Sequence, residues 1–219
     1  MGIVNFGIPL DETQHLQAKM NLNVAVEGGT YRGGTAKLLS GLFDKVYTIE
    51  KSDQMLQEAK QNLAACKNVV LLNGDTRSNL PQILKSEDGI LFWLDAHWSG
   101  GHTYGVNDEC PLIEELELIF SSGIKTFAIM VDDARLFMAP PPSPHAHEAW
   151  PSVADISAVL PDGWDLIIWS DVIFITPSDV DFRTYMQERA TAEWIRWGQM
   201  NSPSLKNCLA GFVRFLLRK

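Results

Sequence analysis

The chain has 219 residues, which suffice for one sizeable domain with its own core but leave little room for a second full domain. Its formal net charge is −9 and it contains no run of basic residues, which argues against nucleic acid as a partner because phosphate backbones bind clustered lysine and arginine. Three separated cysteines without C-x-x-C spacing, no secretory leader and no apolar stretch of about 18 to 20 residues indicate a soluble, cytoplasmic protein without disulfides, zinc or membrane contact.

The first informative segment is an apolar run that ends at a carboxylate and opens into a glycine-rich turn. Val24-Ala-Val is followed by Glu27 and then by glycines at positions 28, 29, 33 and 34, before an expected helix over 35–42. Glycine lets the backbone turn sharply and approach a ligand closely, and a carboxylate accepts hydrogen bonds from hydroxyl or ammonium groups. This combination points to a nucleoside-like cofactor.

The spacing of the turn separates three cofactor classes. The dinucleotide fingerprint G-x-G-x-x-G needs a glycine where Thr30 or Tyr31 stands, which weakens the NAD interpretation. The phosphate-binding pattern G-x-x-x-x-G-K-[ST] has Gly34 in place of its lysine, and Lys37 comes one helical turn too late. The pattern that remains, E-x-G-x-x-x-G beginning at Glu27, suits S-adenosylmethionine. A purely structural glycine turn is the alternative.

Apolar strands then alternate with helices along the chain. We expect strands at 45–50, 68–75, 90–94 and 126–131, and helices at 52–65, 80–84 and 111–121, the first of them capped by Ser52. Continuous apolar strands between amphipathic helices are typical of a parallel sheet that is covered on both faces. The sequence therefore predicts an α/β, doubly wound fold.

Acidic residues stand at or just after the ends of all five strands. They are Glu27, Glu50, Asp75, Asp95 and the pair Asp132-Asp133. Ligands of such sheets collect beyond the carboxyl ends of the strands. Any one of these acids could be an ordinary helix cap. Several on one rim repel each other unless a ligand or a cation compensates, so as a group they indicate a binding site.

The rest of the chain begins with a proline-rich loop, residues 138–151. We expect it to lie over the site as a semi-rigid segment, because proline excludes both helix and central strand. A helix at 153–160 and an antiparallel strand pair at 164–169 and 172–176 should complete the sheet. We place the domain at 1–178. The tail, 179–219, is expected to be a helical extension that packs against the domain or a second subunit, which leaves a homo-oligomer open.

The motifs quoted above resemble those of the class I S-adenosylmethionine-dependent methyltransferases. Within that class the chain is most similar to the divalent-metal-dependent O-methyltransferases, which include catechol O-methyltransferase and the macrolide-sugar O-methyltransferases. The resemblance covers roughly residues 22 to 177. It implies a mostly parallel, seven-stranded Rossmann-like sheet with helices on both faces and an antiparallel last strand.

The resemblance also assigns roles in cofactor binding. Glu27, Gly29 and Gly33, with the adjoining Gly28 and Thr30, would frame the methionine end of S-adenosylmethionine. Glu50 would hold the ribose hydroxyls, Asp75 would meet the adenine amino group, and Asp95 would also border the cofactor. A carboxylate paired with a diol is expected from the hydrogen-bonding groups alone.

In the family that the chain resembles, Mg²⁺ is held by acids that follow the fourth and fifth strands. Asp95, Asp132 and Asp133 occupy these places here. Oxygen ligands from neighbouring strand ends match the preference of Mg²⁺, and a cation would relieve the repulsion between the acids. The alternative is that Asp132 or Asp133 caps a turn and Asp95 only orients loop amides.

Catalysis by methyl transfer needs an oxygen nucleophile at the correct distance and angle. We expect Asp95 to take part through the metal and His97 to act as general base, although His97 could equally be a structural histidine. Catechol O-methyltransferase has a lysine three residues beyond its first metal acid. Trp98 stands there in this chain, so that base cannot be transferred.

The acceptor is expected to be a hydroxyl of a small molecule or sugar. The segment from Glu27 to Gly34 and the pair Asp132-Asp133 are closer to the sugar-modifying branch of the family. Polar and aromatic side chains that could line an acceptor pocket are His102, Tyr104, His145, His147, Glu148, Trp93, Trp98 and Trp150. A solvated polar loop is the default for the histidines and Glu148, and Trp93, inside a strand, is expected in the core.

Two functions of other classes remain. An NAD-type oxidoreductase with an atypical nucleotide turn would bind NADH tightly. A catalytically silent cofactor-binding protein would keep the glycine turn but would be indifferent to the loss of Asp95 and Asp132.

Overall fold

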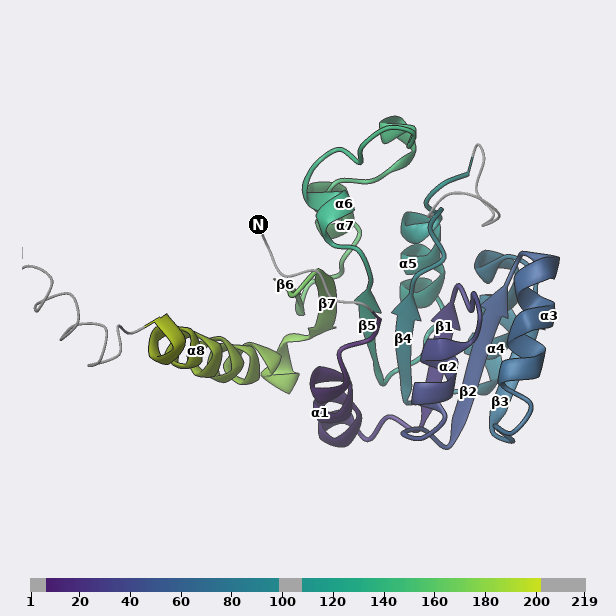
Figure 1. The fold of residues 1–219 in the computed structure, drawn as a ribbon, viewed down its shortest axis with the longest axis horizontal. Coiled ribbons are helices and arrows are strands. Elements are labelled where there is room, and N and C mark those ends of the chain that lie inside the picture. Colours follow the sequence, from purple (N-terminus) through teal and green to yellow (C-terminus); the bar gives the residue numbers. More distant parts are fainter. Residues whose placement is uncertain (1–6, 99–107, 202–219) are drawn as a thin grey trace, which may run out of the picture. The chain divides into compact units, whose positions relative to one another are not determined.

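A computed structural model describes residues 7–98 and 108–201 of the chain. The chain divides into two compact units, and the boundary in the sequence lies between Val180 and Asp181. In the first unit, seven strands form one sheet in the order β3-β2-β1-β4-β5-β7-β6 (Figure 1). The strands are β1 Val24–Gly28, β2 Lys45–Glu50, β3 Val69–Asn73, β4 Ile90–Leu94, β5 Phe127–Val131, β6 Trp164–Trp169 and β7 Val172–Pro177. The predicted doubly wound α/β fold is confirmed.

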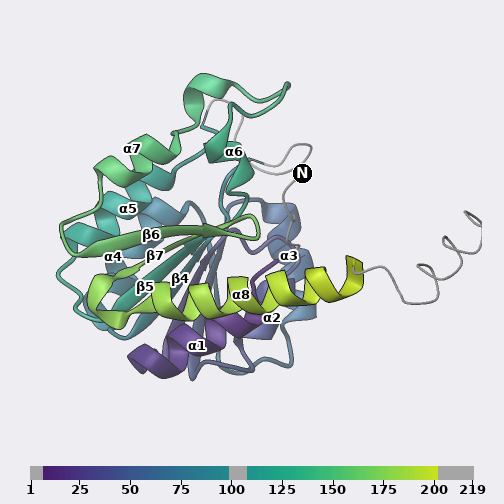
Figure 2. The same ribbon diagram turned by 90° about the vertical axis from the view of Figure 1, so that its left-hand side faces the viewer.

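Helices cover both faces of this sheet. Figure 2 shows α4, α5 and α7 on one face and α1, α2 and α3 on the other. The helices of the first unit are α1 Leu10–Met20, α2 Gly34–Leu39, α3 Asp53–Asn62, α4 Thr76–Ser86, α5 Leu112–Ser121, α6 Arg135–Met138 and α7 Val153–Ala158, with short 3-10 turns η1 His147–Ala149 and η2 Ser178–Val180. Because helices cover both faces of the sheet, the central strands β1, β4 and β5 are buried at every position.

The sheet is parallel from β3 to β5 and changes direction only at β7. Leu94 of β4 pairs with Gly28 of β1 on one side and with Val131 of β5 on the other. Strand β7 runs antiparallel to both β5 and β6, as the sequence predicted for the last pair. The carboxyl ends of β1, β4 and β5 therefore lie side by side, which brings together the residues that follow them.

Two of the longer helices differ from the sequence expectation. No helix was expected before β1, but α1 occupies Leu10–Met20. The short helix expected at 80–84 is in fact the longer α4, Thr76–Ser86. Pro81 lies inside α4 and removes one backbone donor, whereas the Asp75 side chain caps the helix by accepting from Arg77 N at 2.9 Å. The cap allows the helix to begin five residues before the proline.

The second unit contains α8, Phe182–Asn201. The rings of Trp194 and Trp197, three residues apart on this helix, stack with their centroids 5.8 Å apart. A helix was predicted for this tail, and its packing partner stays a prediction. None of the described helices is long and apolar enough to cross a membrane.

Candidate active site

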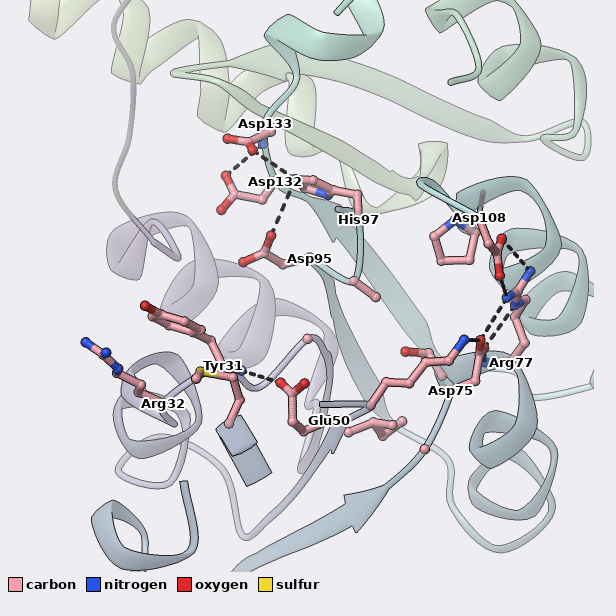
Figure 3. Close-up of a pocket in the computed structure, with 18 of the residues that line it drawn as sticks. Tyr31, Arg32, Glu50, Asp75, Arg77, Asp95, His97, Asp108, Asp132 and Asp133 are labelled. Atoms are coloured by element: carbon pink, nitrogen blue, oxygen red, sulfur yellow. Dashed lines mark hydrogen bonds and ion pairs between the residues drawn. The ribbon is translucent and has the colours of Figure 1, made fainter. Parts of the chain in front are cut away.

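A single cavity of about 580 Å³ runs along the carboxyl ends of the parallel strands. Figure 3 shows its side chains in three groups: Glu50 with Tyr31, Asp75 with Arg77 and Asp108, and Asp95 with His97, Asp132 and Asp133. Seven of the predicted site residues line it, namely Gly29, Glu50, Asp75, Asp95, His97, Asp132 and Asp133. The other four, Glu27, Gly28, Thr30 and Gly33, belong to the adjoining turn and are not among the described lining residues.

The turn after β1 places glycine residues, which have no side chain, at the cavity wall. Gly29 has φ +88°, and a Cβ atom at this position would lie 2.2 Å from the backbone oxygen of Asp95. Gly33 has φ +81°, and a Cβ there would lie 2.9 Å from Cγ of Leu63. The amides of Gly29 and Thr30 both donate to the carbonyl of Ile49, at 3.0 and 3.1 Å. Only glycine meets these requirements of conformation and space at positions 29 and 33.

Glu27 lies beneath this turn and is 1% exposed. Its carboxylate accepts a hydrogen bond from the Thr48 hydroxyl, which also lies 2.5 Å from the Thr30 hydroxyl. Burial, followed by the charges of Asp95 and Glu50, raises the pKa of Glu27 to about 8. The carboxyl is therefore largely protonated at neutral pH, and a cationic ligand nearby would favour its ionised form.

Backbone amides fix the orientation of Glu50. Tyr31 N donates to one carboxylate oxygen at 2.7 Å, and Ser52 N donates to the other at 2.7 Å. Burial raises the pKa of Glu50 above its ordinary value even though these hydrogen bonds act in the opposite direction. Each oxygen retains acceptor capacity, so the side chain is suited to a ligand diol.

Asp75 is paired with cationic side chains. Its Oδ1 accepts from Arg77 Nε at 2.9 Å, and its Oδ2 accepts from Arg77 Nη2 at 2.8 Å and from Lys51 Nζ at 2.7 Å. Hydrogen bonding to Arg77 is the largest of the effects that hold the pKa of Asp75 well below its usual range. Arg77 also contacts Asp108 at 3.3 Å. Asp75 therefore borders the cavity as an ionised group, and its contact with adenine stays a prediction.

The strand pairing brings Asp95 and Asp132 to neighbouring positions on the rim. Asp95 N donates to the carbonyl of Gly28 at 2.9 Å, and Asp132 N donates to the carbonyl of Leu94 at 3.2 Å. Burial is the main cause that raises the pKa of Asp95 to about 7, and the charges of Asp132 and Asp133 add to it. Burial likewise raises the pKa of Asp132 to about 6. Both carboxyls resist ionisation in the absence of a cation.

Asp133 has a different environment. Its Oδ2 lies 2.8 Å from His97 Nε2, and its Oδ1 lies 2.7 Å from Arg135 Nη1. Burial raises the pKa of Asp133, but His97 and Arg135 outweigh this effect and leave the pKa below its ordinary value. Among the described residues, no three His, Cys, Asp or Glu side chains form a group that could hold a metal ion. The three aspartates thus meet at one rim without forming a three-ligand site.

His97 joins the acids of this rim. Its Nε2 lies 3.6 Å from Asp95 Oδ1 in addition to the contact with Asp133. Burial lowers the pKa of His97, but the hydrogen bond with Asp133 and the charges of Asp95, Asp133 and Asp132 outweigh it and leave the pKa raised. The imidazole is thus placed to exchange a proton with the rim, and its role as general base stays a prediction.

The other predicted aromatic and polar residues have several environments. His145 and Trp150 contact Glu109, whereas His147 and Glu148 pair with each other at 3.3 Å with exposed side chains. Trp93 is fully buried in β4, in accordance with a core position, and the Trp98 ring meets the His145 ring edge to face at 5.1 Å. His102 and Tyr104 lie outside the described residues.

Three buried glutamates were not singled out from the sequence: Glu12 on α1, Glu109 and Glu115. Glu109 is 5% exposed and holds the proline-rich loop. Glu115 on α5 is 1% exposed, and its Oε1 has no hydrogen-bond partner among the described residues. Burial is the main effect that raises the pKa of Glu115 to about 7. A glutamate inside the apolar pattern of the segment 111–121 was the available signal for Glu115.

No protein family model and no curated protein matches the sequence. Solved structures match its fold at 16% sequence identity. A candidate caffeoyl-CoA O-methyltransferase from Staphylococcus aureus aligns over 80% of this chain and 86% of its own, with a TM-score of 0.57. A methyltransferase from Podospora anserina bound to S-adenosylhomocysteine aligns over 78% and 80%, also with a TM-score of 0.57. An rRNA methylase from Streptococcus thermophilus aligns over 80% and 99%, with a TM-score of 0.50.

These likenesses identify the architecture. The chain has the fold of the class I S-adenosylmethionine-dependent methyltransferases, as its motifs predicted. The names of two of these proteins imply different acceptors, caffeoyl-CoA and rRNA, so the fold leaves the chemistry to be argued from the site.

Proposed function

We propose that this protein is an S-adenosylmethionine-dependent O-methyltransferase that acts on a hydroxyl of a small molecule or sugar with the help of Mg²⁺. The observation that carries the proposal is the single cavity lined by Glu50 at one place and by Asp95, His97 and Asp132 at another. The fold supports the choice of cofactor. The net charge of −9 favours a small acceptor over a nucleic acid.

The cofactor would lie along the glycine turn. Glu50, held by two backbone amides, would accept hydrogen bonds from the ribose hydroxyls. Glu27, beneath the turn, would ionise in response to the positive groups of the methionine moiety, with Gly28, Gly29, Thr30 and Gly33 framing that end. Bound in this way, S-adenosylmethionine supplies a methyl group on a positively charged sulfur.

The rim fits Mg²⁺ through two carboxylates better than through three. Asp95 and Asp132 offer oxygen ligands whose pKa values are raised in the absence of a cation. Asp133 already contacts His97 and Arg135, so we assign it to the orientation of His97. Mg²⁺ commonly binds through one or two carboxylates and several waters. When bound, it lowers the pKa of the acceptor hydroxyl and fixes its position.

The protein residues would then orient the acceptor and take up its proton. The acceptor oxygen forms a bond to the methyl carbon while the carbon–sulfur bond breaks, which leaves a neutral thioether. The hydroxyl proton would pass to the neutral form of His97, which Asp133 orients. The sulfur keeps the electron pair of the broken bond and becomes neutral. The acceptor loses one proton, so the total charge is unchanged.

Calorimetric titration tests the proposal without knowledge of the acceptor. The protein is titrated with S-adenosylhomocysteine, NADH and ATP, each with and without Mg²⁺. We expect binding of S-adenosylhomocysteine only. The substitution Glu50→Gln should weaken it at least about tenfold, because a charge-assisted hydrogen bond to the diol is lost. The matched control is Glu117→Gln, which removes an exposed carboxylate that does not line the cavity and should leave binding unchanged.

Two results would contradict the proposal. Preferential uptake of NADH would favour an oxidoreductase. Binding of S-adenosylhomocysteine together with no heat of Mg²⁺ binding, in the wild type and in Asp132→Asn alike, would remove the metal from the mechanism.

A further inference from the structure

One buried carboxylate fastens the proline-rich loop (residues 138–151) to the rest of the domain. Trp150 Nε1 donates to Glu109 Oε2 at 2.7 Å, and Ala146 N donates to Glu109 Oε1 at 3.0 Å. His145 Nδ1 lies 3.3 Å from Oε2. All three partners belong to the loop, and Glu109 lies 36 to 41 residues before them. We call this set of contacts the Glu109 latch.

The backbone of Glu109 makes a second attachment. Trp98 N donates to the Glu109 carbonyl at 2.7 Å. Trp98 directly follows His97, so one residue holds the loop by its side chain and the segment after β4 by its main chain. Relative movement of the two segments would break short hydrogen bonds in a buried place, which is costly.

The latched loop packs an aromatic wall against His97. The Trp150 ring meets the His97 ring at a centroid distance of 5.3 Å. Phe137 lies 5.6 Å from Trp150 and 6.4 Å from His97. The imidazole also makes a polar contact, because His97 Nε2 lies 2.8 Å from Asp133 Oδ2. The wall and the carboxylate together fix the ring plane.

Glu109 can influence the cavity only through these neighbours. It is not among the described residues that line the cavity, whereas His97 is. Burial raises the pKa of Glu109, but the hydrogen bonds from Ala146, Trp150 and His145 outweigh it and leave the pKa below its ordinary value. The latch is therefore ionised at neutral pH and accepts strong, charge-assisted hydrogen bonds.

We propose that Glu109 is a positioning residue whose carboxylate fastens the proline-rich loop against the end of β4 and thereby sets the orientation of His97 at the acceptor end of the cavity. The inference rests on the proposed function for the role of His97 in methyl transfer. The latch itself is independent of the identity of the cofactor.

The test compares Glu109→Gln with Glu148→Gln, a control on the same loop whose side chain is 75% exposed. In Glu109→Gln an amide NH₂ group replaces one carboxylate oxygen and faces a loop donor. We expect the Ala146 amide to exchange its hydrogen at least about tenfold faster, a factor that corresponds to one lost hydrogen bond. The ¹H–¹³C signal of the His97 ring should shift. Glu148→Gln should change neither quantity.

A second variant guards against a misfolded Glu109→Gln. Glu109→Asp keeps the charge but withdraws the carboxylate by one methylene, so both readouts should lie between those of the wild type and Glu109→Gln. Binding of S-adenosylhomocysteine should stay within about twofold in all variants, because Glu109 does not line the cavity.

The outcomes separate the latch from the proposed function. Unchanged Ala146 exchange in Glu109→Gln, or in Glu109→Asp where only that variant folds, would overturn the latch. Faster exchange with an unmoved His97 signal would reduce Glu109 to a structural role. Failure of the wild type to bind S-adenosylhomocysteine would defeat the proposed function, and the exchange and ring measurements would still decide the latch.

Discussion

The end of β3 and the ends of β4 and β5 carry aspartates on the same rim, but the protein treats them in opposite ways. Asp75, after β3, is paired with Arg77 and Lys51, and its pKa lies well below the usual range. Asp95 and Asp132 have pKa values raised to about 7 and about 6. Arg77 and Lys51 pair with the acid of the first region. In the second region, the charge of His97 only partly offsets burial and the repulsion between the acids. The contrast shows which acids of the cavity keep raised pKa values.

The largest expected effect comes from Gly29, which packs against the backbone of Asp95. In Gly29→Ala the new Cβ would lie 2.2 Å from the Asp95 carbonyl oxygen at a φ of +88°. We expect the free energy of unfolding to fall by about 3 kcal/mol from strain and overpacking together. Urea unfolding measures this change.

Gly34→Ala is the matched control for that substitution. Its Cβ would meet no atom within 4 Å, and Gly34 is the first residue of α2. We expect no loss and a gain of at most about 1 kcal/mol in the free energy of unfolding. Equal losses in the two variants would show that the contact between the turn and Asp95 is absent in solution.

Asp75→Asn tests the region after β3, where Arg77 and Lys51 pair with the acid. The substitution removes the charge that Arg77 and Lys51 share, although asparagine can still cap α4. The free energy of unfolding should fall by about 2 kcal/mol at pH 7, because hydrogen bonds to charged groups are lost. Chemical unfolding at pH 7 gives the value, and a neutral outcome would mean that solvent already screens this network.

Glu115→Gln tests how burial on α5 raises the pKa of a carboxyl although the charges of Arg77 and His97 act in the opposite direction. The folded-state pKa of Glu115, about 7, exceeds its ordinary value of 4.5. The wild type therefore loses stability relative to the variant as the pH rises from about 4.5 to about 7, and the difference stays constant above that. We expect it to reach about 3 kcal/mol at pH 8 and to be near zero at pH 4.5. Urea unfolding at several pH values measures it, and a difference that is independent of pH would contradict the interpretation.

Asp132→Asn tests the ends of β4 and β5. It should change the free energy of unfolding in the direction opposite to Asp75→Asn. Removal of one of two mutually repelling carboxylates should raise the free energy of unfolding by about 1 kcal/mol at pH 8 without Mg²⁺. Added Mg²⁺ should stabilise the wild type and not the variant. Thermal unfolding with and without Mg²⁺ provides the comparison. A destabilised variant in the absence of metal would mean that the favourable charge of His97 outweighs burial and repulsion at Asp132.

Glu58→Gln measures how much the free energy of unfolding changes when an exposed carboxylate loses its charge, and it serves as the baseline for both regions. Glu58 bonds Arg32 at 2.8 Å, but the two side chains are 38% and 58% exposed. Exposed pairs contribute little, so the free energy of unfolding should change by less than about 0.5 kcal/mol. A larger change in urea unfolding would indicate that the effects predicted for Asp75 and Asp132 are not specific to their surroundings.

Much of the fold follows from local patterns. The strands β2 and β4, 45–50 and 90–94, were predicted with the bounds that the structure has, because each is a short apolar run between clear boundaries. The positions of Asp95 and Asp132 on one rim follow from the same argument, since parallel strands end at the same edge. Helix α1 was missed because its apolar pattern is weak, with Leu16 buried among polar residues.

The pairing of the acids was harder to predict. Asp133 contacts both His97 and Arg135, and its backbone has a φ of +57°. No pattern in the sequence predicts this conformation or these contacts. The Glu109 latch joins residues up to 41 positions apart, and such contacts depend on tertiary structure alone. Arg77 was closer to prediction, because it stands two residues after Asp75 and can fold back on its carboxylate.

Because one chamber of about 580 Å³ contains both Glu50 and the Asp95–Asp132 rim, a single inhibitor could span it. Under the proposed function, an adenosine joined by a short linker to a metal-chelating diol would engage both ends at once. Tethering makes the second contact intramolecular, with an effective concentration on the order of millimolar for a short flexible linker. Such a bisubstrate compound would report the spacing between the two ends through the linker length at which its affinity is greatest.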